Sequence, residues 1–263
     1  MGAAASLRIL TLNLRGCFTW DGGNPWPVRW PLIARLFERH APDIIACQEA
    51  MWPNLICLGP SLSNHRCHRG RPGGSTRLLG VYNPVFWTPA KLAMHAADGF
   101  WLSDRPNRYS SSWGARHTRT ATWLHLSHQG RPFFVVNLHL DHQSRDARLR
   151  GSELIIRRLR AMGWPDIPAV VLGDFNANPE HPEHALWLDA GMRDTWQTMR
   201  LPEDAPAYTV HGFKGRRISD ETRIDWILHS APMEPTRVAI LTDSCPPRYP
   251  SDHYPVIADL TWS

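Results

Sequence analysis

The stretch VVLGDFNANP at residues 170–179 places two polar side chains directly after a run of apolar residues. Val170, Val171 and Leu172 predict a buried strand, and the alternation of an extended chain turns Asp174 and Asn176 to the same side. A carboxylate and a carboxamide on one face can accept a proton from water and hold a charged oxygen. Because Gly, Asp, Asn and Pro also form turns, the stretch alone fits a plain junction of strand and turn equally well.

The other strand-like runs carry polar groups of the same kind near their ends. They are Asn13 in the first run, Gln48 and Glu49 in the second, Asn137, His139 and Asp141 in NLHLDH, Arg223 and Asp225 in RIDW, and Ser251, Asp252 and His253 in SDHYP. Each group alone is ordinary, since a lone Glu is usually solvated and a lone His usually makes one structural hydrogen bond. Buried charges need a partner or a metal, so the repetition favours one shared pocket.

These residue types indicate metal-assisted hydrolysis of a phosphate ester. Glu49 is a hard oxygen ligand suited to Mg²⁺, which takes few protein carboxylates and keeps several waters. Asp174 could take a proton from an attacking water, and Asp225 or Asp252 could hold a histidine in its working tautomer. Three donors could hold a phosphoryl oxygen as charge builds, namely His139, His253 and Asn176.

The composition is that of an ordinary globular protein, with 263 residues, 43% hydrophobic and 20% charged. We expect a single domain over residues 1–263, with no stable membrane insertion because no run approaches the roughly 20 apolar residues of a span. MGAAAS at the N-terminus matches a short myristoylation pattern at Gly2, but an untethered tail is favoured. The net charge of +5 favours anionic partners such as phosphates and is too small to indicate nucleic-acid binding by itself.

The five cysteines favour reduced thiols and a cytoplasmic location, because their number is odd and none forms CxxC. An alternative is a zinc site on Cys57, His65, Cys67 and His68, although this spacing matches no standard finger.

Strands alternate with a few helices along the chain. The expected strands are 7–14, 43–49, 81–87, 121–127, 133–140, 169–175, 223–229 and 256–262, and the expected helices are 30–40, 145–162 and 181–191. Runs such as FFVV and AVVL are apolar on both faces, which is typical of a sheet covered on both sides. The pattern predicts a layered α/β or α+β domain.

The ordered motifs resemble those of the endonuclease/exonuclease/phosphatase family, the superfamily of pancreatic deoxyribonuclease and abasic-site endonucleases. The similarity rests on TLNLRG (11–16), CQEA (47–50), NLHLDH (137–142), GDFNANP (173–179), RIDWI (223–227) and YPSDHYPV (249–256), which span nearly the whole chain. FWLSDRPNRYSSSWGARHTRTATW (100–123) and HGFKG (211–215) resemble the compact, mostly bacterial hydrolases of this family.

The resemblance implies an α/β fold of four layers, an αββα sandwich with two packed mixed sheets, and a site at one end of it. It implies that Asp174 positions or deprotonates the water and that Asn176, His139 and His253 bind the phosphate. Glu49 would be the principal metal ligand. The further implied roles are Asn13 beside Glu49, Asp225 orienting His253, and Asp252 holding the metal or its water.

Substrate contacts are expected at Arg119 and Asn83, while Trp113 could line the pocket or cover core. Arg15 stands two residues after Asn13, where abasic-site nucleases often have Asp. Its positive charge would disfavour a second cation, so we expect one dominant metal, Mg²⁺ with Mn²⁺ as the alternative, and a weaker case for an abasic-site endonuclease.

Three functions compete. The first is a Mg²⁺-dependent phosphoesterase that attacks a phosphodiester or phosphomonoester directly with water, its partner being a phosphorylated small molecule, lipid headgroup or nucleic acid. The second is a Mg²⁺-dependent nuclease, for which the arginines of 66–77 and 105–119 could grip DNA or RNA. The third, an inactive binding module, predicts missing catalytic residues, and here the set is complete. The sequence indicates no obligate protein partner.

Overall fold

The computed structural model describes residues 6–75, 80–203, 207–220 and 222–263, so Gly2 of the myristoylation pattern lies outside the described residues. One group of strands consists of β1 (Leu7–Asn13), β2 (Ile44–Gln48), β3 (Arg66–His68), β4 (Val85–Trp87), β11 (Met233–Ile240) and β12 (Val256–Trp262). A second group consists of β5 (Leu92–Trp101), β6 (Thr120–His128), β7 (Arg131–His139), β8 (Ala169–Asp174), β9 (Arg193–Asp194) and β10 (Asp225–His229). The helices are α1 (Trp26–His40), α2 (Trp52–Leu58), α3 (Arg145–Met162), α4 (Pro182–Asp189) and α5 (Thr195–Thr198), with a 3-10 turn at Pro60–Leu62.

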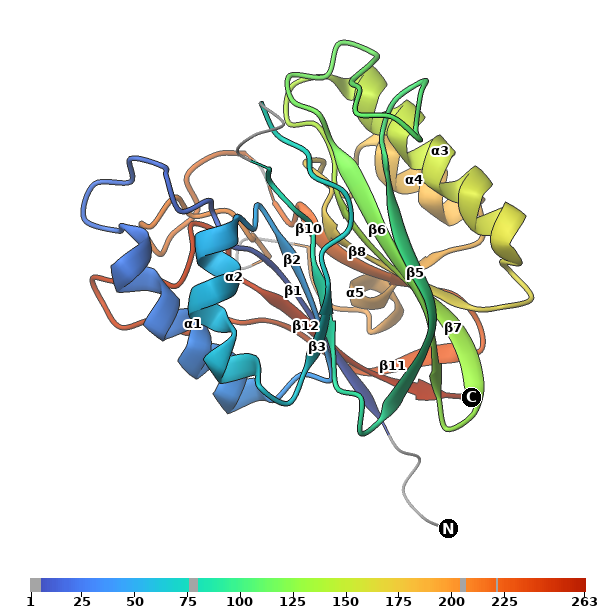
Figure 1. Cartoon of the computed structure of the whole chain (residues 1–263), viewed down its shortest axis with the longest axis horizontal. Coiled ribbons are helices and arrows are strands. Elements are labelled where there is room, and N and C mark those ends of the chain that lie inside the picture. Colours follow the sequence, from blue (N-terminus) through green and yellow to red (C-terminus); the bar gives the residue numbers. More distant parts are fainter. Residues whose placement is uncertain (1–5, 76–79, 204–206, 221) are drawn as a thin grey trace.

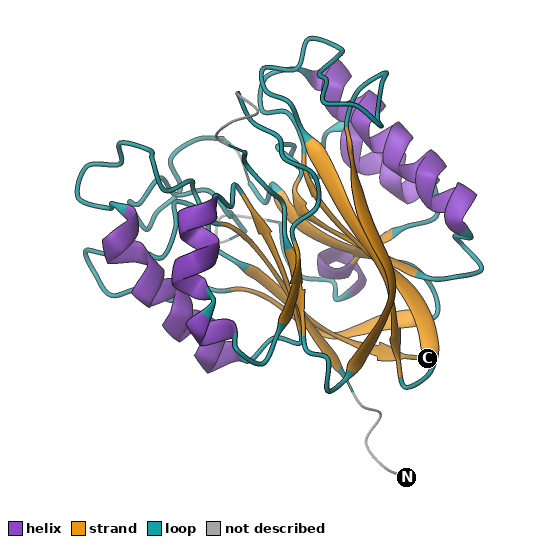
Figure 2. Ribbon diagram, in the orientation of Figure 1, coloured by secondary structure: helices purple, strands orange, loops and turns teal. Residues whose placement is uncertain are grey.

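Each group forms one six-stranded mixed sheet, in the orders β11-β12-β1-β2-β4-β3 and β5-β6-β7-β8-β10-β9. The sheets pack face to face, with α1 and α2 outside the first and α3 and α4 outside the second (Figures 1 and 2). The predicted four-layer sandwich is therefore confirmed. Among the described helices, none is both long enough and apolar enough to cross a membrane.

Alternation along the strands builds three apolar layers. In β8, Val170 and Leu172 join the core between the sheets, whereas Val171 joins the core beneath α3 and α4. In β1, Ile9 faces the other sheet and Leu10 faces α1. Burial of both faces explains why these strands read as continuous apolar runs.

Each sheet contains one parallel pair, β1 with β2 and β7 with β8, and these central strands lie against one another across the sandwich. Their carboxyl ends lie at one end of the molecule, where long loops converge (Figure 1). The polar residues that end the strands are thereby brought together.

Several element boundaries differ from the predictions. Helix α1 begins four residues earlier than expected, because Pro27 suits its first turn. Strand β10 begins at Asp225, so Arg223 precedes the strand, and β4 covers only the end of the expected 81–87. Helix α3 matches its prediction, starting after the Ser144 hydroxyl that accepts from Ala147 N–H and ending at the left-handed Gly163.

Candidate active site

Strand pairing in the second sheet sets three polar side chains in one row. His139, the last residue of β7, is the register partner of Asp174, the last residue of β8. Asp225, the first residue of β10, pairs with Asp174 from the other side. All three side chains are buried, so the row lies inside the protein and not on a solvated strand end.

The first sheet contributes Asn13 and Glu49 to the same place. The Nδ2 amide of Asn13 donates to Glu49 Oε1 at 3.2 Å and to Asp174 Oδ2 at 3.0 Å. The second bond links the two sheets across 161 residues of sequence. Two carboxylates from different sheets therefore share one neutral amide between them.

Unusual backbone conformations shape this end of the sandwich. Glu49 and Asn176 both have positive φ, at 57° and 50°, as does Arg15 at 51°. Such conformations are uncommon outside glycine and cluster at functional sites. Gly173 has φ 141°, and a Cβ there would lie 2.0 Å from the carbonyl oxygen of Leu138, so the backbone before Asp174 requires glycine.

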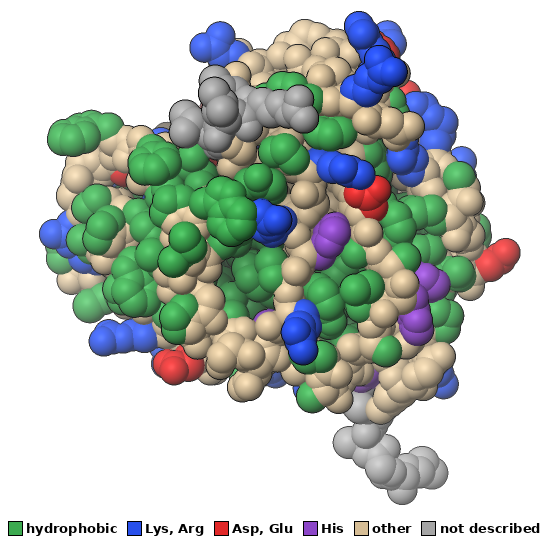
Figure 3. All heavy atoms as spheres, in the orientation of Figure 1, with side chains coloured by type: hydrophobic (Ala, Val, Ile, Leu, Met, Phe, Trp, Pro, Cys, Tyr) green, Lys and Arg blue, Asp and Glu red, His purple; other side chains and the backbone are tan. Residues whose placement is uncertain are grey.

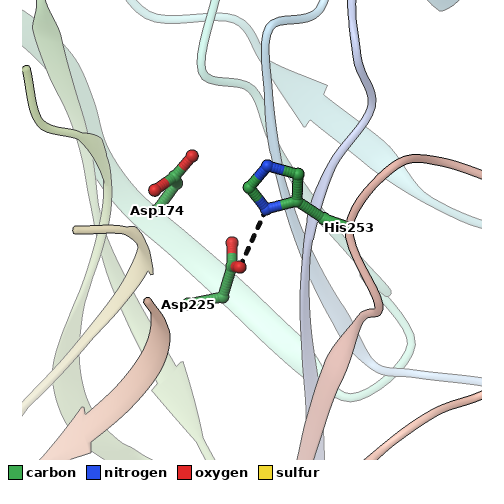
Figure 4. Close-up of side chains that lie close together, drawn as sticks. All are labelled: Asp174, Asp225 and His253. Carbon is green, nitrogen blue, oxygen red and sulfur yellow. Dashed lines mark hydrogen bonds and ion pairs between the residues drawn. The ribbon is translucent and has the colours of Figure 1, made fainter. Parts of the chain in front are cut away.

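His253 and Asp225 form a hydrogen-bonded pair, with 2.9 Å between Nδ1 and Oδ2 (Figure 4). Burial acts to lower the pKa of His253, but the carboxylates of Asp225, Asp252 and Asp174 outweigh it and raise the pKa well above the usual value. The imidazole is therefore protonated near neutral pH. Of the two aspartates considered from sequence, Asp225 is the one that contacts this ring.

Asp174 is suited to accept a proton. Burial and the nearby carboxylate of Asp225 raise the pKa of Asp174 to about 7, against the opposing effects of His253, Asn13 and Arg119. Its Oδ1 accepts the Asn176 backbone N–H at 3.0 Å, which fixes the carboxylate.

His139 offers a neutral donor beside this carboxylate. Burial and the positive charges of Arg119 and His253 lower the pKa of His139 well below its usual value. The 3.3 Å contact between His139 Nε2 and Asp174 Oδ2 therefore involves a neutral imidazole and is not a full ion pair. A neutral imidazole can donate to a phosphoryl oxygen without a pre-existing charge.

Arg119 is a partly buried cation with unused hydrogen-bonding capacity. Its Nε makes no hydrogen bond, and the nearest carboxylate contact is 3.7 Å, to Asp141 Oδ2. Burial lowers the pKa of Arg119, while Glu49, Asp174 and Asp141 raise it. A guanidinium in this state is well placed to bind a phosphate oxygen.

Glu49 fits a divalent cation best among the carboxylates. Its oxygens accept from the Asn13 amide and from Gly16 N–H at 3.2 Å, and these bonds hold the pKa of Glu49 below its usual value although burial raises it. No arginine, lysine or histidine forms an ion pair with Glu49 among the described residues. A partly buried, ionised carboxylate lacking a contacting cation suits Mg²⁺.

Two other predicted metal ligands are otherwise engaged. The Oδ1 of Asn13 accepts the Arg15 backbone N–H at 2.9 Å, so Asn13 turns its amide NH₂, not its oxygen, toward Glu49. Asp252 lies 3.6 Å from Arg15 Nε and accepts from the Ser251 hydroxyl at 3.2 Å. Neither residue presents a free oxygen beside Glu49.

Asp174, Asp225 and His253 are the one set of three His, Cys, Asp or Glu ligand atoms within 4.8 Å of one another in the described chain. We assign this set to acid–base chemistry, because Asp225 already occupies His253 Nδ1. This set includes none of the residues of the zinc alternative, which were Cys57, His65, Cys67 and His68. His65 instead contacts the Pro42 carbonyl at 2.9 Å, and all five cysteines are free.

These groups open into a cavity of about 510 Å³. It is lined by Asn13, Glu49, Asn83, Arg119, His139, Asp174, Asn176 and His253 among others. The Asn83 amide donates to the backbone oxygen of Thr120 at 2.8 Å, which holds this wall in place. The predicted residue Trp113 does not line the cavity: its indole N–H donates to Asp104 and its ring packs against the core beneath α3.

Several other histidines are buried or line the cavity. His184 and His211 are buried, with His211 stacked on Tyr254 at 4.0 Å between ring centroids. His117 and His142 line the cavity and were missed as site residues. The position of His142 directly after NLHLD was an available signal, but His117 lies in a loop with no sequence pattern to mark it.

Apolar side chains border the site on the side of the first sheet. Hydrophobic atoms gather over α1 and α2 in Figure 3. Phe18, which also lines the cavity, is 70% exposed, and Trp20 in the same loop is 97% exposed. The cavity is therefore polar at its base and apolar at this part of its rim.

Comparison with known proteins agrees with this geometry. The model of the Endonuclease/Exonuclease/phosphatase family matches residues 10–253. An endonuclease/exonuclease/phosphatase family protein from Bacteroides thetaiotaomicron is 27% identical, with a TM-score of 0.88 and coverage of 99% of both chains. A mannosyl-6-phosphatase from the same species is 28% identical, with a TM-score of 0.87, over 98% of this chain and all of the other.

More distant structures share the fold alone. D. rerio TDP2, solved with a single-stranded DNA product, is 14% identical with a TM-score of 0.73, over 98% of this chain and 99% of the other. The comparison with curated protein sequences found no significant match. From the family match over most of its length, the chain belongs to the endonuclease/exonuclease/phosphatase family.

Proposed function

We propose that this protein is a divalent-metal-dependent phosphoesterase that hydrolyses a P–O bond of a phosphorylated small molecule by direct attack of water. The observation that carries the proposal is the convergence of Glu49, Asp174, Arg119 and the His253–Asp225 pair on one cavity. A phosphomonoester is the favoured substrate, supported by the likeness to a mannosyl-6-phosphatase at 28% identity.

Glu49 would hold Mg²⁺, or Mn²⁺ as the alternative, and the bound cation would supply positive charge to the phosphate. Asp174 accepts the proton of the attacking water, since its pKa of about 7 suits a base near neutral pH. His139, Asn176 and Arg119 donate to the phosphoryl oxygens as charge builds on them.

His253 donates a proton in this scheme, whereas Asp174 accepts one. Because Asp225 binds Nδ1, the ring presents Nε2 to the cavity and carries a proton there when protonated. It can donate to a phosphoryl oxygen or to the departing alkoxide. No covalent enzyme intermediate is required in this scheme.

The proposal is tested by a substrate screen with Mg²⁺ and Mn²⁺. Phenyl phosphate, a bis-aryl phosphodiester and a single-stranded oligonucleotide separate phosphomonoesterase, phosphodiesterase and nuclease activity. We expect release of phosphate from the monoester, and a loss of at least about 100-fold in Asp174→Asn and His253→Ala. His95→Ala, on the exposed part of β5, is the matched control.

Preferred cleavage of the oligonucleotide, with steep inhibition by salt, would favour the nuclease. Full activity in both site variants would refute the assignment of residues. No activity toward any ester with either metal would refute the proposed function.

A further inference from the structure

One wall of the cavity carries two imidazoles that the proposed reaction does not use. His117 and His142 both line the cavity, and their rings stack with 5.5 Å between centroids and 21° between planes. His117 comes from the loop before β6, and His142 from the loop after β7. Two separate loops must therefore be held in register to form the pair.

The buried carboxylate of Asp141 holds the two loops that carry this pair. Asp141 Oδ2 accepts the backbone N–H groups of Arg116 at 2.9 Å and His117 at 3.4 Å. Its Oδ1 accepts those of Gln143 at 3.0 Å and Ser144 at 2.8 Å. The pKa of Asp141 is held below its usual value, since these bonds outweigh its burial. His117 is partly exposed and His142 is exposed, but the backbone bonds to Asp141 fix the position of both loops that carry them.

The neighbours of each ring fix what it offers to a ligand. Arg119 Nη2 lies 3.1 Å from His142 Nδ1, and because a guanidinium can only donate, Nδ1 of His142 is the acceptor. The proton of the neutral ring is therefore on Nε2, which becomes a donor. The Ser75 hydroxyl lies 3.0 Å from His117 Nδ1 and occupies that nitrogen.

Both rings are neutral near pH 7. Burial lowers the pKa of His117 and of His142, and the adjacent Arg119 lowers both further. The N–H donor of His142 and the ring nitrogen of His117, which donates or accepts according to its tautomer, match hydroxyl groups, which both accept and donate hydrogen bonds.

A second phosphate group fits this wall less well. Of the described residues lining the cavity, the positively charged ones are Arg15, Arg119 and His253, and His253 belongs to the proposed site of the reacting phosphate. Arg15 is paired with Asp21 at 2.9 Å. Arg119 contacts His142 through Nη2, and its remaining hydrogen-bonding capacity is assigned to the reacting phosphate. Among the described arginines that line the cavity, none is therefore free for a second dianion, and Arg116, whose charge acts on both rings, is not part of that lining.

We propose that the stacked pair His117–His142 is a subsite for hydroxyl groups on the alcohol part of the substrate, which makes the substrate class a phosphorylated sugar or other polyol. This inference rests on the proposed function, since the adjacent phosphate site supplies the phosphoryl group. The pair does not touch the reacting atoms and acts as a specificity determinant.

The test compares a hexose 6-phosphate with phenyl phosphate, which has a phosphate but no hydroxyl group. For His117→Ala and His142→Ala, the ratio of kcat/KM between these substrates should fall about tenfold, the effect of one lost hydrogen bond. Use of the ratio cancels any shared effect of His142→Ala on Arg119 and phosphate binding. His95→Ala is the control, because His95 forms a similar pair with His125, 5.2 Å between centroids, and does not line the cavity.

Calorimetry with Mg²⁺ supplies a second readout that needs no turnover. Wild-type protein should bind the hexose 6-phosphate more tightly than inorganic phosphate, and both variants should lose that difference. Unchanged ratios and unchanged binding would overturn the subsite, whereas absence of all hydrolysis alone would count against the proposed function. Selective loss of binding to a hexose 1,6-bisphosphate, with the 6-phosphate unaffected, would identify a second-phosphate site and overturn the proposal.

Discussion

At the scale of single residues, the site depends on side chains whose pKa values differ from those of the same groups in water. Asp174 is buried between Asp225 and Glu49-bound Asn13, and its raised pKa records the cost of ionising it there. Such a residue serves chemistry at the expense of stability. His253 has the opposite shift because its partner is a carboxylate.

Asp174→Asn should therefore abolish activity and stabilise the fold. The pKa of Asp174 is about 7 in the folded protein and ~3.9 in the unfolded chain. Ionisation of Asp174 therefore lowers the free energy of unfolding as the pH rises between these two values, and the full loss is reached above pH ~7. We expect a gain on the order of 1–2 kcal/mol in the free energy of unfolding at pH 8 and no gain at pH 3.5. Urea denaturation at both pH values measures it, and a loss of stability at pH 8 would contradict the account.

The pH dependence of kcat/KM should be bell-shaped. The rate should rise as Asp174 loses its proton and fall as His253 loses its own at higher pH. The two limbs give values that belong to the coupled pair. A bound cation lowers the pKa of the acidic limb, so that limb should lie below 7 with Mg²⁺. In Asp225→Asn the basic limb should move to lower pH, and an unmoved limb would exclude His253 as its source.

At the scale of elements, helix α1 is tied to the site loops by a fully buried arginine. Arg29 donates to the carbonyl oxygens of Leu14 at 2.6 Å, Arg15 at 2.7 Å and Pro250 at 3.3 Å, and also to those of Asn24 and Gly16. Leu14 and Arg15 directly follow Asn13, and Pro250 lies shortly before His253. One guanidinium thereby joins the end of β1 to the loop before β12.

Arg29→Met should destabilise the protein by about 3 kcal/mol, because several buried carbonyl groups lose their donor. It should also lower kcat more than it raises KM, since it moves the loops and not the substrate contacts. Arg35→Met, on the exposed part of the same helix, is the matched control. Equal effects of the two substitutions on unfolding by urea would contradict this role.

At the scale of the whole molecule, the layered fold follows from the sequence more directly than the details of the site. β8 begins with a continuous apolar run and β12 is apolar except for Asp259 and Thr261, so the location of both could be predicted within a residue. β5 was missed because its sequence, LAMHAADGFW, is rich in Ala and Gly. β11 was missed because it contains Pro235 and a register shift beside it.

Most residues of the site could be predicted from the strand ends, but the hydrogen bonds that join them could not. The choice of Asp225 over Asp252 as the partner of His253 depends on where β10 begins relative to β12. The left-handed backbone at Glu49 is set by packing and carries no sequence signal. His117 is positioned by backbone bonds to Asp141 and by contacts with Ser75 and His142, which cannot be predicted from residue types.

The central claim is that Glu49 and Asp174 from different sheets, with His253, surround one metal and phosphate site. The most direct measurement is the anomalous scattering of Mn²⁺ in crystals grown with Mn²⁺ and inorganic phosphate. We predict one strong peak beside the Glu49 carboxylate, with phosphate between that peak and the side chains of Arg119 and His139, and no peak in Glu49→Gln. A peak bound elsewhere, with the carboxylate of Glu49 unliganded, would contradict the account.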